Sequence, residues 1–456
     1  MNKSKIFKSA AFRKGTYSII LTIIIVAVLV GINIFVRQLP ASATEFDMSE
    51  DKLFTLGDTT KEVASSLTQD VVLTVTANED DVDARIVSLL KQYEALSSHI
   101  TVKYVDPELY PSVLTDLETS AGYIVAQCEA LNKINYISLN DILYYDSSYN
   151  YYFDGEGSIT SAINSVVTDT IKYIYALSGH GESAVGTAVT AALNKSNLMY
   201  QDSFTLLTSD IPEDCDILIC NGPTSDITED EASTIADYID NGGNFIVLFN
   251  YEAKSTPNLD ALCNKYGIGV NHAIIGDQKN YAGRSYYAFI PEYNSSSDIT
   301  GGYSTSDGNQ LVLLQTTIGF ETLENSDVTV DEFLTTSSNG FEYVEGSSDV
   351  TLGTYAVAAR SALSSDNGGS VTAYGTYYMI DDAIVGHYSV INTEIFVNSI
   401  IVDFDDISNI SIDPIAISAN YNYIASSGLI AVFLIGIIPV LLIVIGIFRW
   451  NYRRKL

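Results

Sequence analysis

Two long apolar runs, one near each end of the chain, constrain what this sequence can fold into more than any other feature. They occupy residues 17–37 and 428–448. Each approaches the ~20 residues that an α-helix needs to cross ~30 Å of hydrocarbon. The second run contains Pro439, which transmembrane helices tolerate, and ends at Arg449 and Trp450, a pair typical of the membrane interface. We therefore expect two transmembrane helices.

The charges of the chain predict how these helices are oriented. The first 16 residues and residues 449–456 carry nine of the 23 basic residues and no acidic residue. The positive-inside rule therefore places both termini in the cytoplasm. The rest of the chain holds 14 basic and all 56 acidic residues, a net charge of −42, and its central region lies outside the cell membrane in this interpretation. Such a surface repels phosphate backbones, so we expect no nucleic-acid partner.

A cleaved signal peptide is the alternative interpretation of the first apolar run. Ala41-Ser42-Ala43 follows the run and resembles a small-residue cleavage site. The apolar stretch is longer than the usual signal core of ~7–15 residues, which favours a retained anchor. Both interpretations send the acidic region to the same side of the membrane.

The cysteines and histidines give no pattern typical of a disulfide framework or a metal site. Cys215 and Cys220 fall on one predicted strand, where their Cα atoms lie too far apart for a bridge, and no Cys-x-x-Cys pair occurs. The four histidines are scattered, and the acidic clusters match no calcium loop. The chain also lacks a Walker A motif. We expect no cofactor and no metal.

Residues 38–150 predict a first α/β domain. A strand–helix–strand unit with about 20 residues between its strands favours parallel pairing, and a hairpin-like pair follows it. This order resembles a thioredoxin-like domain without its cysteines. The expected elements are a helix at 59–67, a strand at 71–77, a helix at 83–96, a strand at 100–106 and hairpin strands at 122–128 and 135–141.

Residues 151–405 predict a second domain, with an open, mostly parallel α/β sheet. One of its helices has clear start and stop signals in the sequence. Thr228 and Glu231 form a capping box at its start, and Gly242-Gly243 ends it. From about residue 294, Ser/Gly/Asn-rich turns separate shorter strands. A stalk over 406–427 follows. The expected helices are 155–169, 184–193, 228–241 and 392–401, and the expected strands are 171–177, 216–220, 244–250, 310–316, 355–360 and 370–380.

The segment from Ser178 to Ser183, SGHGES, places a serine, a histidine and a carboxylate where a strand ends and a helix is expected to open. Open α/β sheets bind ligands beyond the carboxyl ends of their strands. The candidate contact residues are Gly179, His180, Gly181 and Glu182, with Asn221 and Gly222 after the next strand. No Gly-x-Ser-x-Gly elbow is present, and Glu182 could instead favour the dipole of the following helix. Catalysis, a non-catalytic docking turn and a purely structural turn all remain open at this point.

Several segments, taken together, resemble one family. FDMSEDKLFTLGDTTKEVASSL is similar to the juxtamembrane segment of GldG-type proteins, auxiliary components of ABC transport systems first named for gliding motility. GEGSITSAINSVV, YALSGHGE and DILICNGPTSDITEDEASTIADYIDNGGNFIVLF match the family's central core in order. GHYSVINTEIFVNSI is similar to its terminal asparagine-containing helix.

The resemblance implies an extracytoplasmic region of two α/β domains, thioredoxin-like and then flavodoxin-like. The second would be similar to class I glutamine amidotransferases without their catalytic residues. It also implies an ABC-2-type permease and a separate ATPase subunit as partners. We therefore expect a non-catalytic, two-pass auxiliary subunit of an ABC-type transport or export system, whose acidic region contacts substrate or envelope partners. The alternatives are a membrane-tethered hydrolase that uses the GHGE turn and a glycan-binding surface protein supplied with 31 tyrosines.

Overall fold

The computed structural model describes residues 55–417, except 146–148, 169, 202, 254, 307, 309, 344–350, 366–367 and 405–406, together with six isolated residues near the two ends. Both predicted membrane helices, 17–37 and 428–448, lie outside this described region apart from a few single residues. Among the described residues, no helix is both long and apolar enough to span a bilayer. Contacts divide the chain into two units, residues 1–143 with 154–415 and residues 144–153 with 416–456.

A four-stranded sheet forms from the first α/β region, in the order β2-β1-β3-β4. Strands β1 and β2 are parallel, and β3 is antiparallel to both β1 and β4, so the predicted strand–helix–strand unit and hairpin are confirmed. Asp83 caps the connecting helix α5 by accepting a hydrogen bond from the Arg85 amide. The bounds are α4 Asp58–Ser66, β1 Val71–Val75, η1 Glu79–Asp81, α5 Ala84–Leu96, β2 Ile100–Tyr104, α6 Pro111–Asp116, β3 Tyr123–Cys128, β4 Lys133–Ser138 and α7 Leu139–Ile142.

Helix α8, Gly155–Val167, confirms the helix expected at 155–169 and packs against β3 and β4 of this sheet. A buried polar network also joins it to helices α4 and α5. The Tyr93 hydroxyl lies 2.5 Å from the Thr160 hydroxyl, which also lies 2.9 Å from that of Thr60. The Glu156 carboxylate accepts hydrogen bonds from the Gly57 amide and the Thr60 hydroxyl. Helices α4, α5 and α8 are thereby joined through side chains whose polar atoms are paired.

A twelve-stranded sheet forms from the second region. The main path runs β19-β18-β11-β16-β20-β21-β10-β9-β7-β8, and β17 pairs with β14 and β20. The strands are β7 Lys172–Ala176, β8 Leu198–Tyr200, β9 Cys215–Asn221, β10 Asn244–Leu248, β11 Ile268–Asp277, β14 Glu292–Tyr293, β16 Thr317–Thr322, β17 Val328–Thr335, β18 Gly340–Tyr343, β19 Leu352–Gly353, β20 Ala356–Leu363 and β21 Ser370–Tyr374; β12 Tyr281–Ala282, β13 Ser285–Phe289 and β15 Leu314–Gln315 form a separate small sheet.

Only one half of the large sheet is parallel, which corrects the expected mostly parallel sheet. Strands β8, β7, β9, β10 and β21 pair in parallel, whereas the strands from β20 to β19 pair antiparallel. Numbered along the chain, the parallel half has the order 2-1-3-4-5. The antiparallel half is the Ser/Gly/Asn-rich part of the sequence, where short turns permit hairpins in place of crossover helices.

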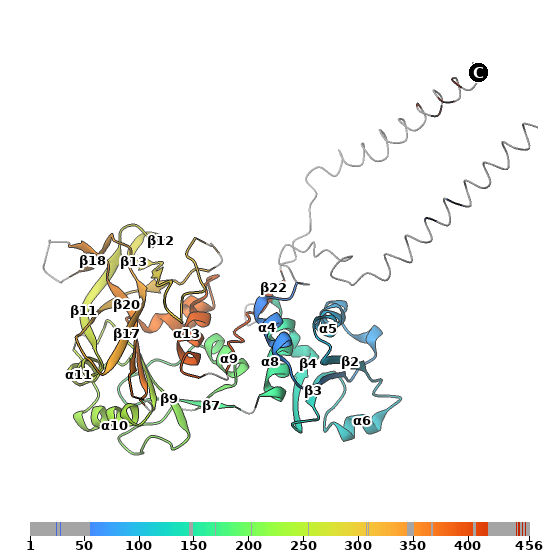
Figure 1. Cartoon of the computed structure of the whole chain (residues 1–456), viewed down its shortest axis with the longest axis horizontal. Helices are drawn as coiled ribbons and strands as arrows, with labels where there is room; N and C mark the ends of the chain where they lie inside the picture. Colours follow the sequence, from blue (N-terminus) through green and yellow to red (C-terminus); the bar gives the residue numbers. More distant parts are fainter. Residues whose placement is uncertain are drawn as a thin grey trace, which may run out of the picture. The chain divides into compact units, whose positions relative to one another are not determined.

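Helices cover both faces of the parallel half, and the side chains of its strands alternate accordingly. Ile217 and Ile219 belong to one core, with helices α9 and α13, whereas Leu218 and Cys220 belong to the other, with α10 and α11. Successive side chains of a strand point to opposite faces, so a sheet that is covered on both faces needs apolar residues at consecutive positions of its strands. The helices are α9 Thr187–Lys195, α10 Glu229–Asp240, α11 Pro257–Lys265, η2 Tyr377–Ile380, α12 Asp382–Val385 and α13 Asn392–Ile401 (Figure 1).

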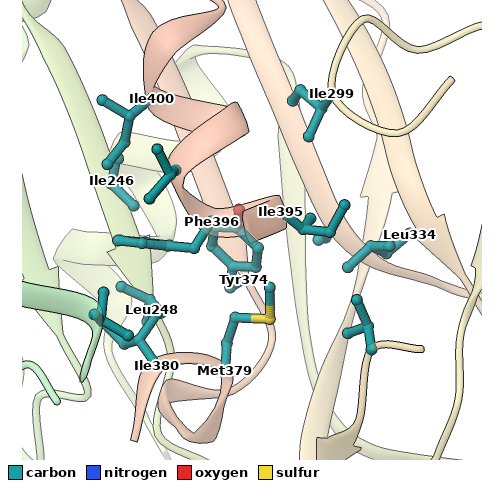
Figure 2. Packing of buried hydrophobic residues seen from close by; sticks show 14 of the residues in the cluster. Ile246, Leu248, Ile299, Leu334, Tyr374, Met379, Ile380, Ile395, Phe396 and Ile400 are labelled. Carbon is teal, nitrogen blue, oxygen red and sulfur yellow. The ribbon is translucent and has the colours of Figure 1, made fainter. Parts of the chain in front are cut away.

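The core beside α13 is dense and aromatic at its centre. Figure 2 shows Phe396 and Ile395 of this helix against Tyr374 of β21, with Met379 and Leu248 near them. The Tyr374 ring lies 5.5 Å from the Phe333 ring and 5.8 Å from the Phe396 ring, and its hydroxyl bonds the Ser399 hydroxyl at 2.6 Å. Burying a tyrosine with its hydroxyl paired avoids the penalty of an unsatisfied polar group.

The expected strand at 310–316 is wrong over most of its length. Only Leu314–Gln315 pairs as β15, although Val312 and Leu313 are buried. The Val312 amide donates to the Tyr293 hydroxyl, and the Leu313 amide donates to the Asn392 side chain. Side-chain acceptors thus satisfy amides that a neighbouring strand would otherwise bind, so an apolar run is buried here without forming a strand.

Candidate functional site

The candidate residues named from the sequence follow two neighbouring parallel strands. Strand β7 leads into Gly179–Glu182, and β9 ends at Asn221, directly before Gly222. Since β7 and β9 are paired in parallel, their carboxyl ends meet at the same edge of the sheet. In the order 2-1-3-4-5 this edge, between the first and third strands, is where the strand order reverses, and such positions bind ligands in open α/β sheets.

His180 lies between two carboxylates. Its Nδ1 is 3.2 Å from Glu182 Oε1, and its Nε2 is 3.1 Å from Glu231 Oε2. All three side chains are at most 9% exposed. The Glu182 carboxylate also accepts a hydrogen bond from the backbone amide of His180 at 2.7 Å. We call His180, Glu182 and Glu231 the histidine clamp.

The backbone around the clamp needs glycine at two positions. Gly179 has φ +125° and Gly181 has φ +76°, a region that L-residues rarely adopt. A Cβ at Gly181 would lie 2.0 Å from the Thr224 hydroxyl. The His180 carbonyl accepts hydrogen bonds from the amides of Thr224 and Ser225, so the loop after β9 is bound directly to the turn after β7.

Asn221 and Gly222 complete this junction from the β9 side. The Asn221 side chain donates to the carbonyls of Ser183 and Ala184, and its backbone carbonyl accepts from the Ser183 amide. Gly222, with φ +63°, lies against Tyr377, because a Cβ at this position would come within 2.9 Å of that side chain. The structure therefore places all six candidate residues at the same edge of the sheet, in the turns that follow β7 and β9.

Glu182 does not lie at a helix start, so the alternative role at a helix dipole is wrong. Helix α9 begins at Thr187, not at residue 184, and Glu182 turns back onto His180 instead. The carboxylate at the start of α9 belongs to Asp382, which accepts from the Thr187 amide and hydroxyl and from the Ala188 amide. Burial alone would raise the pKa of Asp382, but these donors together lower it.

The geometry of Ser178, His180 and Glu182 is not that of a nucleophile–base–acid triad. The Ser178 hydroxyl donates to the Phe204 carbonyl, and both ring nitrogens of His180 contact carboxylates, so neither faces a hydroxyl. Cys220, which precedes Asn221 on β9, is fully buried. Burial, with the nearby Glu182 and Glu231 charges, raises the pKa of its thiol well above the usual value, which disfavours the reactive thiolate.

Glu231 is the member of the clamp that sequence reasoning missed. The sequence identifies it only as the third residue of a capping box, and the structure confirms that box. Its Oε2 accepts hydrogen bonds from the amide and hydroxyl of Thr228 as well as contacting the histidine. The order of the strands could have pointed to Glu231, because a helix that follows β9 begins near the turn that follows the neighbouring strand β7.

Two buried oxygen atoms of the cluster have no hydrogen-bond partner among the described residues. They are Asn221 Oδ1 and Glu231 Oε1, in side chains that are 2% and 4% exposed. Unpaired buried acceptors can accept a donor from a ligand or water. Within the described part of the chain, no three histidine, cysteine, aspartate or glutamate side chains are arranged to hold a metal ion.

Comparison with sequence families gives two matches in different parts of the chain. Residues 172–345 match the family described as an ABC-type uncharacterized transport system. This range contains β7, the histidine clamp and the whole parallel half of the large sheet except β21. Residues 50–138 match a domain of unknown function that covers the four-stranded sheet. None of the curated proteins compared with the chain matches it.

Solved structures give distant likenesses. The mmIFT52 N-terminal domain is 16% identical, with a TM-score of 0.40, and the match covers 54% of this chain and 100% of that one. An exo-β-1,4-mannosidase from Opitutaceae bacterium strain TAV5 is 8% identical, with a TM-score of 0.28, and the match covers 73% of this chain and 51% of that one.

Proposed function

We propose that this chain, whose residues 172–345 match a family of ABC-type transport systems, is a non-catalytic auxiliary subunit of such a system. That match is the observation that carries the proposal. In the finer form of the proposal the protein is of the GldG type and works with an ABC-2-type permease and a separate ATPase subunit. The chain supplies neither a Walker A motif nor a triad at its candidate site.

Membrane attachment is the second part of the proposal. The apolar runs at 17–37 and 428–448 would anchor the chain in the cell membrane with both termini in the cytoplasm. The two α/β regions, thioredoxin-like and flavodoxin-like, would then lie outside the membrane. The strand order 2-1-3-4-5 of the parallel half supports the second of these assignments.

The edge that carries the histidine clamp is the docking surface we favour. Gly179, Gly181, Thr224 and Ser225 are exposed around the buried histidine, so a partner meets mainly backbone and small polar groups there. The clamp fixes that surface from below, because the carbonyl of His180 holds the loop after β9 in place. A rigid surface of this kind suits recognition, since little conformational entropy is lost on binding.

A photocrosslinking experiment tests this docking surface. A photoreactive amino acid replaces Ala184, which is exposed beside the clamp, in the full chain expressed in its own host. The matched control carries the same amino acid at Thr329, which is exposed on β17. We expect crosslinks to transporter or envelope proteins from position 184 alone. Equal crosslinking from both positions would contradict docking at this edge.

One observation favours glycan binding as a second candidate function. Tyr281, Tyr286 and Tyr343 are 42–48% exposed and surround Phe341 and Tyr287, with ring centroids 4.9–6.3 Å apart. Exposed aromatic rings provide stacking faces for sugars. Saturable binding of envelope polysaccharide by the purified full chain, lost in Tyr286→Ser but kept in Tyr388→Ser, would support it. Tyr388 is a fair control because it is 53% exposed.

A further inference from the structure

A small sheet outside the two large ones is unusually rich in tyrosine. It consists of β5 Leu143–Tyr145, β6 Tyr151–Phe153 and β22 Ile415–Ala416, with β6 in the middle. Two pairs of rings stack across β5 and β6, with centroids 5.7 Å apart for Tyr144–Tyr152 and 4.6 Å apart for Tyr145–Tyr151. Since neighbouring residues of a strand point to opposite faces, the two pairs lie on opposite faces of the sheet.

The pair Tyr145–Tyr151 lies on a face that is open to solvent. Tyr145 is 66% exposed, and Tyr149, two residues before β6, is 87% exposed. Tyr149 also has φ +64°, a conformation rare for a residue with a side chain. We call Tyr145, Tyr149 and Tyr151 the tyrosine face. Tyr145 and Tyr149 are exposed and Tyr151 is half-buried, and aromatic side chains exposed so close together in the chain favour an interaction surface.

The charge around the tyrosine face differs sharply from the rest of the chain. Residues 143–153 contain one charged residue, Asp146, and no charged residue occurs between Asp413 and Arg449. The whole chain nevertheless has 56 acidic residues and a net charge of −33. An aromatic surface with only one charged residue in its own segment, on so acidic a protein, does not suit a basic partner. It suits a partner that accepts apolar rings and phenolic hydroxyls together.

The length of chain after β22 places such a partner close by. Strand β22 ends at Ala416, and the apolar run begins at Gly428, so residues 417–427 connect them. This connection spans at most about 40 Å when fully extended and roughly 20 Å as a flexible coil. If residues 428–448 cross a bilayer, this connection holds the three-stranded sheet within about 40 Å of the lipid headgroups.

We propose that the tyrosine face docks on the headgroup region of the bilayer that holds the C-terminal apolar run. This inference rests on the proposed membrane attachment and adds a second contact to it. Tyrosine is enriched at membrane–water interfaces because its ring is apolar and its hydroxyl is hydrated. The sheet then determines how deeply the first residues of the C-terminal apolar run lie in the membrane.

Fluorescence quenching in reconstituted protein tests the proposal. The single tryptophan, Trp450, is first replaced by phenylalanine in the full chain. Tyr149→Trp, Tyr145→Trp and the control Tyr388→Trp are then made separately in that background, and each variant is reconstituted into phosphatidylcholine vesicles with or without bromine atoms near the headgroups. Flotation with the vesicles is recorded for every sample.

We expect the tryptophans at positions 149 and 145 to lose intensity with brominated lipid and to emit at shorter wavelength, while the tryptophan at 388 is unchanged. Variants that float with the vesicles but show no quenching at 149 and 145 would overturn the proposal and leave membrane attachment intact. Failure to float in any variant would overturn both. Quenching at 388 equal to that at 149 would also overturn it, since the contact would then not be specific.

Discussion

At the scale of single residues, the histidine clamp is the feature on which the candidate site depends. His180 contacts Glu182 through one ring nitrogen and Glu231 through the other, and all three side chains are buried. Removing one member of a buried charged or hydrogen-bonded group costs more than the group contributes as a whole, because the remaining members lose their partner without regaining water.

We therefore predict that His180→Ala lowers the free energy of unfolding by about 3 kcal/mol. Glu182 and Glu231 would face each other without a donor between them. The control is His387→Ala, since His387 is exposed and its ring contacts a backbone carbonyl, and it should change stability by about 0.5 kcal/mol or less. Urea unfolding of the purified full chain measures both. Similar midpoints for the two variants would show that the clamp is not energetically coupled.

Two glycines separate the cost of backbone conformation from that of a steric clash. Gly122 has φ +88° and open space where a Cβ would lie, whereas Gly181 has φ +76° and the Thr224 hydroxyl 2.0 Å from the place of a Cβ. Gly122→Ala should cost about 1–2 kcal/mol from backbone strain alone. Gly181→Ala should cost about 1–3 kcal/mol more, because Thr224 and the loop after β9 must move. Thermal unfolding of both variants measures the difference, and equal losses would contradict a tight junction.

A buried aspartate predicts the pH dependence of stability. Burial alone would raise the pKa of Asp277, but the amides of Asn280, Lys279 and Ser337 and the Ser337 hydroxyl together lower it. A depressed pKa in the folded state adds stability above the unfolded value of about 3.9, and this is lost as the pH falls through the folded pKa.

We expect Asp277→Asn to reduce the free energy of unfolding at pH 7 by about 1–3 kcal/mol. The gap between the variant and the unsubstituted chain should narrow as the pH is lowered below about 4. Unfolding at a series of pH values checks the sign. A gap that widens on acidification would mean that the carboxylate destabilises the loop.

At the scale of secondary-structure elements, local signals in the sequence locate a helix well when its start residues are explicit. The capping box predicts the helix that begins after Thr228, and apolar spacing predicts the helix after Asp83. The start of α9 is predicted wrongly because its capping carboxylate, Asp382, lies 195 residues away in the sequence. The strand expected at 310–316 is wrong for the same reason, because Asn392 binds one of its amides.

The sequence predicts where in the fold the candidate site lies, but it does not predict which side chains contact each other there. The order of strand and turn is enough to put Gly179–Glu182 and Asn221 at the carboxyl edge of a sheet. Nothing local to the histidine points to Glu231, which lies 51 residues further along the chain and meets it because β7 and β9 are neighbours. The periodicity of apolar residues and the spacing of motifs do not predict a contact that depends on which strands are neighbours in the sheet.

Helix α10 carries a prediction of its own. Thr228 caps the helix by accepting from the Glu231 amide, so Thr228→Ala should lower the free energy of unfolding by about 1 kcal/mol. Thr234 is the control, because it lies inside the same helix and its hydroxyl donates to the Asp230 carbonyl. Thr234→Ala should change stability by about 0.5 kcal/mol or less. Chemical denaturation compares the two, and equal effects would exclude a special contribution from the cap.

At the scale of the whole molecule, the acidic central region contains two α/β parts that are built differently. Helix α8 packs on the four-stranded sheet and is joined to α4 and α5 by a buried polar network, whereas helices on both faces of the parallel half of the twelve-stranded sheet contribute buried apolar residues to its two cores. The family match spans 172–345, so it falls on the second part, where the histidine clamp lies. The proposed transport role therefore rests most directly on the large sheet and its carboxyl edge.

The most direct test of that role is to purify the tagged full chain from its own host in several mild detergents and to identify by mass spectrometry whatever stays bound. We expect recovery of an ABC-type permease together with its ATPase subunit. An unrelated tagged membrane protein of the same host, treated identically, should recover neither. Recovery of the chain alone in every detergent would contradict the transport role and would favour an external region that works as an independent binding protein.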